Sequence, residues 1–379
     1  MFKLIISLII STLGICCLLN ISFTQTLAFE SNISSNQRIE NNFSFLKLTY
    51  DTTDNKFQEN TNHPDLINDD RVYVKIKNFT YADKQRYTID GSQPLEFTKI
   101  KPIPTIVFGA GYTGIFILQH IGQMKTIWKE TGKFHFQEDG YYALYSDKAG
   151  HFFGTYLSSY VLAETMMTVG FSWEAASIWG AVLGLAYTTY VEINDGLAVN
   201  WGFSMSDFYA DIAGASFFLA QYYIPFLQNF TPKFMYLPSP WTGNNHRIPS
   251  EMFIDDYSSH TLWLSVNVHN LLPENLKDYW PSWLEISFGY AVRNLCDPIN
   301  YNCPPESEKY SELVYGNPKF IIALDYDLVK LLPDGGNFWN WLRQSLNHFK
   351  LPSPAIEFGS TTKFYLIYPI PLKIGNVRF

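Results

Sequence analysis

Apolar residues recur at helical spacing between residues 104 and 230, and this pattern predicts four helices. Their expected bounds are 114–129, 148–169, 173–192 and 205–226. Small residues are frequent in the last three segments, for example Gly180, Gly184, Gly214 and Ala215. Because small side chains let helix backbones approach closely, we expect a compact bundle.

The longest uncharged runs in this region are short for membrane-spanning helices. Residues 175–191 and 212–227 carry no charge over seventeen and sixteen positions, at or below the length of about 17 residues that a span needs. Glu164 falls near the middle of the second predicted helix. Its charge would be unfavourable inside a membrane unless it faced the protein interior or a wet cavity. We therefore expect a bundle that dips into or lies against a membrane; a soluble core remains the alternative.

Beyond residue 249 the apolar pattern changes to a period of two, which predicts strands. The alternating segments are 261–269, 284–293, 320–328 and 364–370, and each places its apolar residues on one side. Two of them run into Leu-Leu-Pro, at 271–273 and 331–333, before a Trp-containing helical stretch, which indicates two related strand–helix–strand units. Since four strands cannot close a barrel, we expect an open antiparallel sheet packed on the helices. The predicted fold class is α+β.

The first residues have the pattern of a secretory signal. Lys3 precedes an uncharged apolar stretch that is followed by a small-residue site ending at Ala28. We expect cleavage there, with an uncleaved anchor as the alternative, and in both cases an exported protein of the periplasm or outer membrane. The predicted domains are a signal at 1–28, an Asn-rich linker with short strands at 29–103, the helical domain at 104–230 and a β-rich domain at 231–379.

Net charge, aromatic content and cysteine content limit the partners and the cysteine chemistry that we expect. The net charge of −8 disfavours nucleic acid as a partner, and an aromatic content of 17% suits a membrane interface. Cys296 and Cys303 flank a Pro- and Asn-rich loop, so an exported protein could join them in a disulfide. Two unrelated thiols remain the alternative, and a metal site there is disfavoured because no further Cys or His lies at ligand spacing.

Polar residues gather at the edges of the predicted bundle, and they are the candidates for chemistry. The cluster comprises Asp147, Lys148, His151, Glu192, Asp195, Ser206, Asp207 and Asp211. Asp147 and His151 are four residues apart, as are Asp207 and Asp211, so each pair shares a helix face. The metal-ligand set that these residues allow is His151, Glu192, Asp195, Asp207 and Asp211, and the catalytic candidates are His151, Glu192 and Asp207.

A structural interpretation of the same residues also stands. Asp147 and Ser206 fall where helices are expected to begin and could cap them, and Asp207 falls in a first turn. Glu192 and Asp195 end a helix, where the macrodipole disfavours an acid, so they need a cationic partner. A shared ion requires His151 to lie within about 8 Å of at least one of the candidate carboxylates, since ligand bonds are about 2.0–2.2 Å long.

Nucleotide binding is not expected. The run 109–114 matches the spacing G-x-G-x-x-G, but it lacks a βαβ context, and we interpret its glycines as a tight turn before the first helix. No phosphate-binding P-loop spacing is present in the sequence.

Several motifs together resemble a known family. They are Asp147-Lys148-Ala149-Gly150-His151 with Tyr156, Glu192-x-x-Asp195-Gly196, Trp201-Gly202-Phe203-Ser204, and Ser206-Asp207-x-x-Ala210 before Gly214-Ala215. This set resembles the predicted periplasmic (YfiM-like) lipoproteins, domain of unknown function 2279, and more distantly the VanZ-like membrane family. Asp211 stands where family members often have Asn, and no small residue precedes Cys16 as a lipobox requires. The resemblance implies a bacterial cell-envelope protein and no established activity.

Two functions follow as hypotheses. The first is a non-enzymatic envelope protein whose bundle associates with membrane lipid and whose sheet presents a binding or assembly surface for an envelope protein. The second is a hydrolase acting on lipid or cell-wall material, with a divalent metal as its candidate cofactor held around His151.

Overall fold

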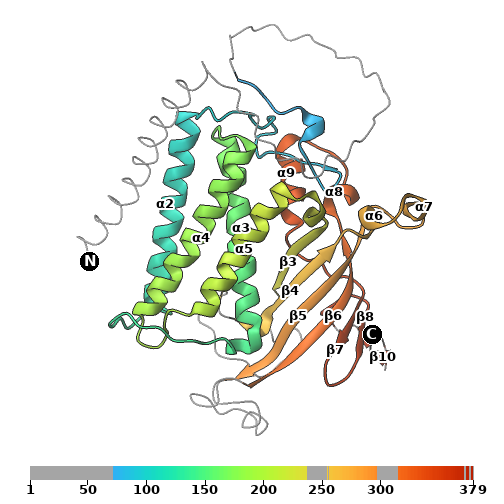
Figure 1. Ribbon diagram of the computed structural model, residues 1–379. Helices are drawn as coiled ribbons and strands as arrows, with labels where there is room; N and C mark the ends of the chain where they lie inside the picture. The colour runs from blue at the N-terminus through green and yellow to red at the C-terminus, as the bar shows by residue number, and fades with distance from the viewer. Residues whose placement is uncertain are drawn as a thin grey trace, which may run out of the picture. The chain divides into compact units, whose positions relative to one another are not determined.

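The computed structural model describes residues 71–236, 254, 256–296, 315–370, 373–374 and 377–378. The predicted signal at 1–28 and the linker up to residue 70 lie outside these residues, as do Cys303 and the side chain of Cys296, so the disulfide stays a prediction. Residues Asn68–Phe379 form one compact unit, in which a helical bundle and a sheet pack together (Figure 1).

The bundle consists of α2 (Pro102–Lys125), α3 (Ser146–Thr168), α4 (Trp173–Leu197) and α5 (Met205–Tyr223). The last three lie close to their predicted bounds. The first begins much earlier, with Pro102 in its first turn, where a missing N–H costs nothing. The run 109–114 therefore lies inside α2, and the predicted turn there is wrong. Among the described residues α2 is the one helix long and apolar enough to cross a membrane, and none of its apolar window is buried.

Close backbone contacts hold α3 against its neighbours. A Cβ on Gly184 of α4 would lie 2.3 Å from Ser159 Oγ, and one on Gly214 of α5 would lie 2.2 Å from the carbonyl oxygen of Phe152. Only glycine fits at such distances, as the small-residue pattern predicted. α3 is therefore the central helix of the bundle, and both α4 and α5 pack on it.

The main sheet is an antiparallel meander in the order β3-β4-β5-β6-β7-β8. Its strands are β3 (Phe230–Tyr236), β4 (His260–Val266), β5 (Leu284–Cys296), β6 (Tyr315–Tyr326), β7 (Ala355–Phe358) and β8 (Lys363–Tyr365). The sequence did not predict β3 and β7. The fold class is α+β, as predicted.

Short elements connect the strands and precede the bundle. The helices α6 (Val268–Leu271) and α7 (Glu274–Lys277) link β4 to β5, and α8 (Leu328–Leu331) and α9 (Asn337–Leu346) link β6 to β7. The remaining elements are η1 (Ile76–Asn78), β1 (Thr80–Tyr81), β2 (Lys84–Gln85), η2 (Tyr142–Tyr145), η3 (Pro225–Asn229), η6 (Tyr257–Ser259), β9 (Lys373–Ile374) and β10 (Val377–Arg378). Each Leu-Leu-Pro segment begins at the last residue of a short helix that follows a strand, α6 or α8. The expected Trp-containing helix is present in the second unit as α9, whereas α7 in the first unit contains no Trp.

The sheet buries its polar side. Glu285, Ser287 and Asp325 are almost completely buried, whereas Phe288 on the opposite face of β5 is 50% exposed. The sheet packs on the helices, as expected, and the contacts run from α3 mainly to β3 and β4. The Phe153 and Phe234 rings stack there with centroids 5.5 Å apart.

Candidate functional site

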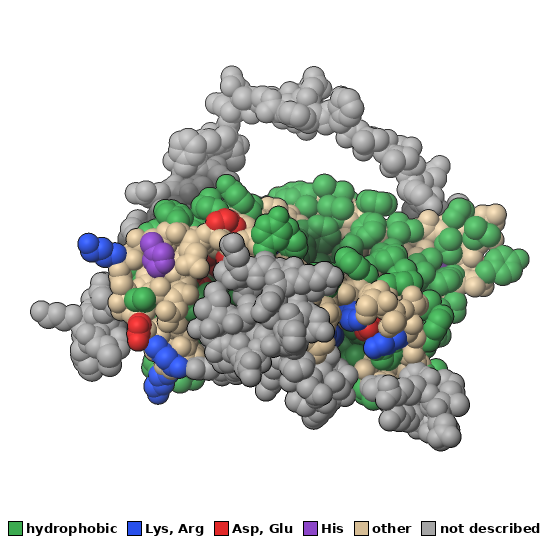
Figure 2. All heavy atoms as spheres, turned by 90° about the horizontal axis from the view of Figure 1, so that it is seen from below, with side chains coloured by type: hydrophobic (Ala, Val, Ile, Leu, Met, Phe, Trp, Pro, Cys, Tyr) green, Lys and Arg blue, Asp and Glu red, His purple; other side chains and the backbone are tan. Residues whose placement is uncertain are grey.

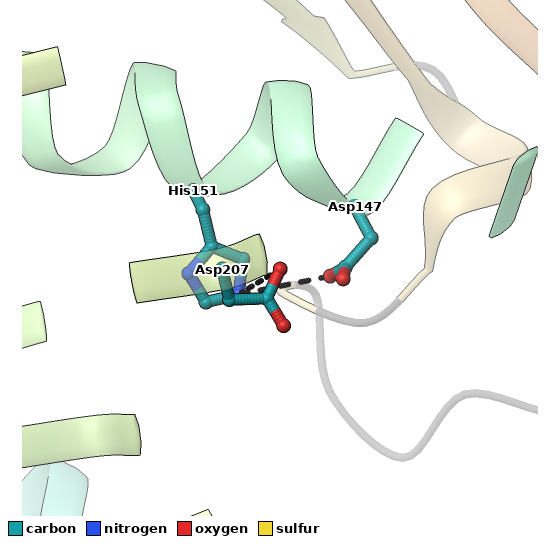
Figure 3. Close-up of side chains that lie close together, drawn as sticks. All are labelled: Asp147, His151 and Asp207. Atoms are coloured by element: carbon teal, nitrogen blue, oxygen red, sulfur yellow. Dashed lines mark ion pairs between the residues drawn. The ribbon is translucent and has the colours of Figure 1, made fainter. Parts of the chain in front are cut away.

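The ends of three helices meet where the bundle approaches the sheet. The start of α3 brings Asp147, Lys148 and His151, the last two turns of α4 bring Glu192, and the start of α5 brings Asp207 and Asp211. Figure 3 shows the imidazole of His151 between α3 and α5, with the Asp147 and Asp207 carboxylates directed toward the same nitrogen. The structure thus brings together most of the residues that the sequence singled out.

His151 lies among four carboxylates. Its Nδ1 is 3.2 Å from Asp211 Oδ1 and 3.6 Å from Glu192 Oε1. Its Nε2 is 3.7 Å from Asp147 Oδ1 and 3.8 Å from Asp207 Oδ1. Burial lowers the pKa of His151, but the hydrogen bond with Asp211 and the charges of Asp147 and Asp207 outweigh it, and the pKa rises well above its usual value.

Lys148 neutralises one side of the cluster. Its Nζ lies 2.5 Å from Asp139, 2.7 Å from Asp147 and 2.6 Å from Asp207. The hydroxyl of Tyr257, from the short helix η6 before β4, also donates to Asp147. Asp147 and Asp207 are therefore already engaged by groups of the protein itself.

Two carboxyl groups of the cluster have raised pKa values. Burial raises the pKa of Glu192 to about 9, and it also raises the pKa of Asp207 to about 8, with the nearby Asp147 as the second cause. Glu192 is therefore protonated at neutral pH unless a further cation is present, whereas the charges of His151 and Lys148 oppose the shift of Asp207. A strong upward shift in a cavity is a mark of functional sites, although structural networks show it too.

Asp211 has one oxygen satisfied and one not. Its Oδ1 accepts a hydrogen bond from Thr155 Oγ1 at 2.8 Å and faces His151 Nδ1. Its Oδ2 is buried and has no hydrogen-bond partner among the described residues. A buried carboxylate oxygen without a hydrogen-bond partner destabilises the folded state, and a bound cation or water would supply the missing interaction.

Two groups of side chains could hold a metal ion, one on each side of the imidazole. Asp147, His151 and Asp207 form the first, and His151, Glu192 and Asp211 form the second. In each group the candidate ligand atoms lie within 4.8 Å of one another. Lys148 and Tyr257 contact the carboxylates of the first group, whereas the second includes the unsatisfied Asp211 Oδ2, so the second fits a cation better.

A cavity of about 500 Å³ opens beside the cluster. Asp147, His151, Glu192 and Asp207 line one part of it. The rest of the lining is mostly apolar and includes Phe153, Leu157, Val191, Phe234, Ile254 and Phe349. The polar side chains of Gln119, Gln123, Ser158 and His260 also line it. A molecule with a polar group and an apolar tail matches this division.

Some predicted roles differ from what the structure shows. Ser204, not Ser206, caps α5, because its Oγ accepts from the Asp207 amide at 3.3 Å. Asp147 lies in the first turn of α3 but does not cap it. Asp195 belongs to neither metal-ligand group among the described residues; Trp128 Nε1 donates to it at 2.6 Å.

Asp139 and Tyr257 were missed by the sequence analysis. Asp139 accepts from Ser204 Oγ at 2.6 Å and from Lys148, and Tyr257 lies 110 residues from the Asp147 that it contacts. Neither belongs to a local motif, and only tertiary packing brings them to the cluster. The acidic Glu138-Asp139 pair shortly before α3 was the available signal for the first.

Residues 134–222 match the family model described as "Predicted periplasmic lipoprotein (DUF2279)". The matched segment spans α3, α4 and most of α5, and it contains each member of the polar cluster. The resemblance inferred from the motifs is thereby confirmed for this segment. The match supports an exported protein of the periplasm or cell envelope, as predicted. No curated protein and no solved structure matches the chain.

Proposed function

We propose that this cell-envelope protein is a metal-dependent hydrolase that binds a first-row divalent cation at His151 Nδ1, Glu192 and Asp211 and acts on an amphiphilic, lipid-like substrate. The observation that carries the proposal is the excess of acid around one imidazole, with Asp211 Oδ2 left without a partner among the described residues. Nitrogen and carboxylate ligands suit Mn²⁺ and Zn²⁺.

The other side of the imidazole supports this choice of ligands. With a cation at Nδ1, the Nε2–H of His151 would face Asp147 and Asp207, which lie 3.7 and 3.8 Å away. A carboxylate behind a ligating histidine fixes the ring and makes its nitrogen a better donor to the metal. Lys148 in turn holds both carboxylates in place.

The chemistry would use water bound to the cation. A cation held by His151, Glu192 and Asp211 would supply activated water for attack on a nearby acyl or phosphoryl ester, because a divalent cation lowers the pKa of water. In that step the new oxygen bond forms at the carbonyl carbon or phosphorus, the ester bond breaks, and the leaving oxygen takes up a proton. Asp207 lines the cavity beside Lys148 and would exchange such a proton.

The test is lipid hydrolysis by the full chain loaded with Mn²⁺ or Zn²⁺. Mixed micelles of phosphatidylethanolamine and phosphatidylglycerol serve as substrate, and mass spectrometry detects released fatty acid or headgroup. We expect turnover that chelation abolishes and that Glu192→Gln and Asp211→Asn reduce at least about a hundredfold. Glu174→Gln, on the same helix but outside the cluster, is the matched control and should retain activity.

Absence of products from the metal-loaded wild type would refute the lipid substrate. Equal activity in wild type and in both cluster variants would refute the site. A network held together by Lys148 alone, with no cation, is the competing structural interpretation; it predicts that neither metal nor chelator changes any property of the protein.

A further inference from the structure

The outer face of the sheet carries a continuous apolar row. Direct cross-strand pairing aligns Leu264 on β4, Phe288 on β5, Ile322 on β6, Ile356 on β7 and Phe364 on β8. Phe288 is 50% exposed and Phe364 is 72% exposed. We call the outer face of β4–β8, with this row at its centre, the apolar sheet face. Figure 2 shows many hydrophobic side chains at the surface on the side of the molecule where Figure 1 places the sheet.

The opposite side of the same strands is charged and buried. Lys233 Nζ lies 2.9 Å from Asp325 and 3.3 Å from Glu285, and these three side chains are at most 1% exposed. Ser265 and Ser287 donate to Asp325. A sheet in water places its polar residues outside, so the arrangement here is the reverse of the one that water favours.

This reversal matches one environment in particular. Membrane β-structures place apolar residues toward lipid and polar residues toward the interior. The outward positions from Leu284 to Tyr290 on β5 and from Pro318 to Tyr326 on β6 hold no Asp, Glu, Lys, Arg or His. Val292, the next position on this side of β5, is completely buried against Ala143. The nine residues from Pro318 to Tyr326 on β6 agree with the 9–11 or so that a strand needs in the hydrocarbon layer of a membrane. An uncharged face complements uncharged acyl chains.

Aromatic residues lie toward both ends of this apolar stretch. At one end the Tyr326 and Trp283 rings have centroids 6.3 Å apart, and Tyr279 near α7 is 83% exposed. Toward the other end the Tyr290 ring packs on Phe320 with centroids 5.3 Å apart, and its hydroxyl donates to the Leu144 carbonyl at 2.5 Å. Tyr and Trp favour the boundary between lipid and water, so their placement agrees with lipid between the two ends.

We propose that the apolar sheet face is covered by the acyl chains of a lipid bilayer. The exposed apolar helix α2 is a second surface of the same unit with a preference for lipid. The proposal concerns the sheet and does not depend on the hydrolase: a protein without cation or activity would still need its apolar sheet face covered.

The test places spin labels on the full chain in vesicles of phosphatidylethanolamine and phosphatidylglycerol. The four native cysteines are replaced by Ser, and a single Cys is introduced in the variants Phe288→Cys and Ile322→Cys. Phe338→Cys is the matched control, because Phe338 is also exposed and lies on α9, which contacts α3 of the bundle through Trp341 and Ser345. Electron paramagnetic resonance then measures collisions of each label with oxygen, which concentrates in lipid, and with a water-soluble nickel chelate.

We expect labels at positions 288 and 322 to collide mainly with oxygen and the label at 338 mainly with nickel. Phe288→Lys should weaken partitioning of the chain into the vesicles by roughly thirtyfold or more, since lysine at the centre of a bilayer is unfavourable. Nickel access at 288 and 322 equal to that at 338 would overturn the proposal, because the face would then lie in water. Labels shielded from both reagents and coupled between chains would overturn it in favour of a second copy as the cover.

Discussion

The sharpest test of the electrostatics around His151 is the variant Glu192→Gln. Glu192 is only 1% exposed, and burial raises its pKa to about 9 from a value near 4.3 in an unfolded chain. The folded state therefore holds a proton that the unfolded state releases, so the stability of the cation-free protein falls as pH rises between these two values. Glutamine has the shape of the protonated acid and does not titrate.

The size of the effect follows from the two pKa values. Between these two values the free energy of unfolding of the wild type falls by about 1.4 kcal/mol for each pH unit. Relative to Glu192→Gln, the wild type therefore loses about 4 kcal/mol of stability between pH 5 and pH 8. Urea unfolding of chelator-treated protein across this pH range measures it. Parallel stability profiles for wild type and Glu192→Gln, differing by less than about 1 kcal/mol in their pH dependence, would refute the reasoning.

Glu285→Gln provides a matched control with the opposite sign. Glu285 is as deeply buried as Glu192, but although burial raises its pKa, Lys233 and Lys84 outweigh that effect and lower it. Its ionised form therefore stabilises the fold above pH values near 4.3, and that contribution is lost as pH falls through the lowered pKa. We expect Glu285→Gln to destabilise the protein at pH 7, by less than the roughly 3–5 kcal/mol of a buried charge left alone, because Asp325 and Asp327 still pair with Lys233 and Lys84.

Two further variants test the packing of the bundle. Arg86→Met removes the ion-pair partner of Glu164, which is completely buried on α3, and should lower the free energy of urea unfolding by about 3–5 kcal/mol. Adding Glu164→Gln should restore most of that loss. No recovery in the double variant would contradict the pairing. Gly214→Ala forces a Cβ to within 2.2 Å of the Phe152 carbonyl oxygen and should lower stability by about 1–3 kcal/mol in a thermal melt; an unchanged melt would contradict the close contact of α3 and α5.

The helices and the polar cluster could be predicted because their signals are local. Helical periodicity and small residues defined α3, α4 and α5, and spacing of four placed His151 on the same face as Asp147. β3 was missed because Pro232 interrupts its pattern, and β7 because it has only four residues. Asp139 and Tyr257 were missed because their contacts depend on tertiary packing.

The orientation of the sheet could not be predicted from alternation. A period of two shows that Phe288 and Ser287 point to opposite sides, but it does not show which side is inside. We predicted an open sheet with one apolar face, packed on the helices, and assigned neither face to the interior. Lys233, Glu285 and Asp325 pair across three different strands, and that pairing allows the polar side to be buried instead.

Cation binding tests the proposed site most directly. Mn²⁺ is titrated into the chelator-treated full chain at pH 7.5, and free Mn²⁺ is followed by electron paramagnetic resonance. The account predicts one tightly bound ion per chain, loss of that binding in Glu192→Gln and Asp211→Asn, and unchanged binding in Glu174→Gln. No bound ion in the wild type, or equal binding in all the variants, would contradict it.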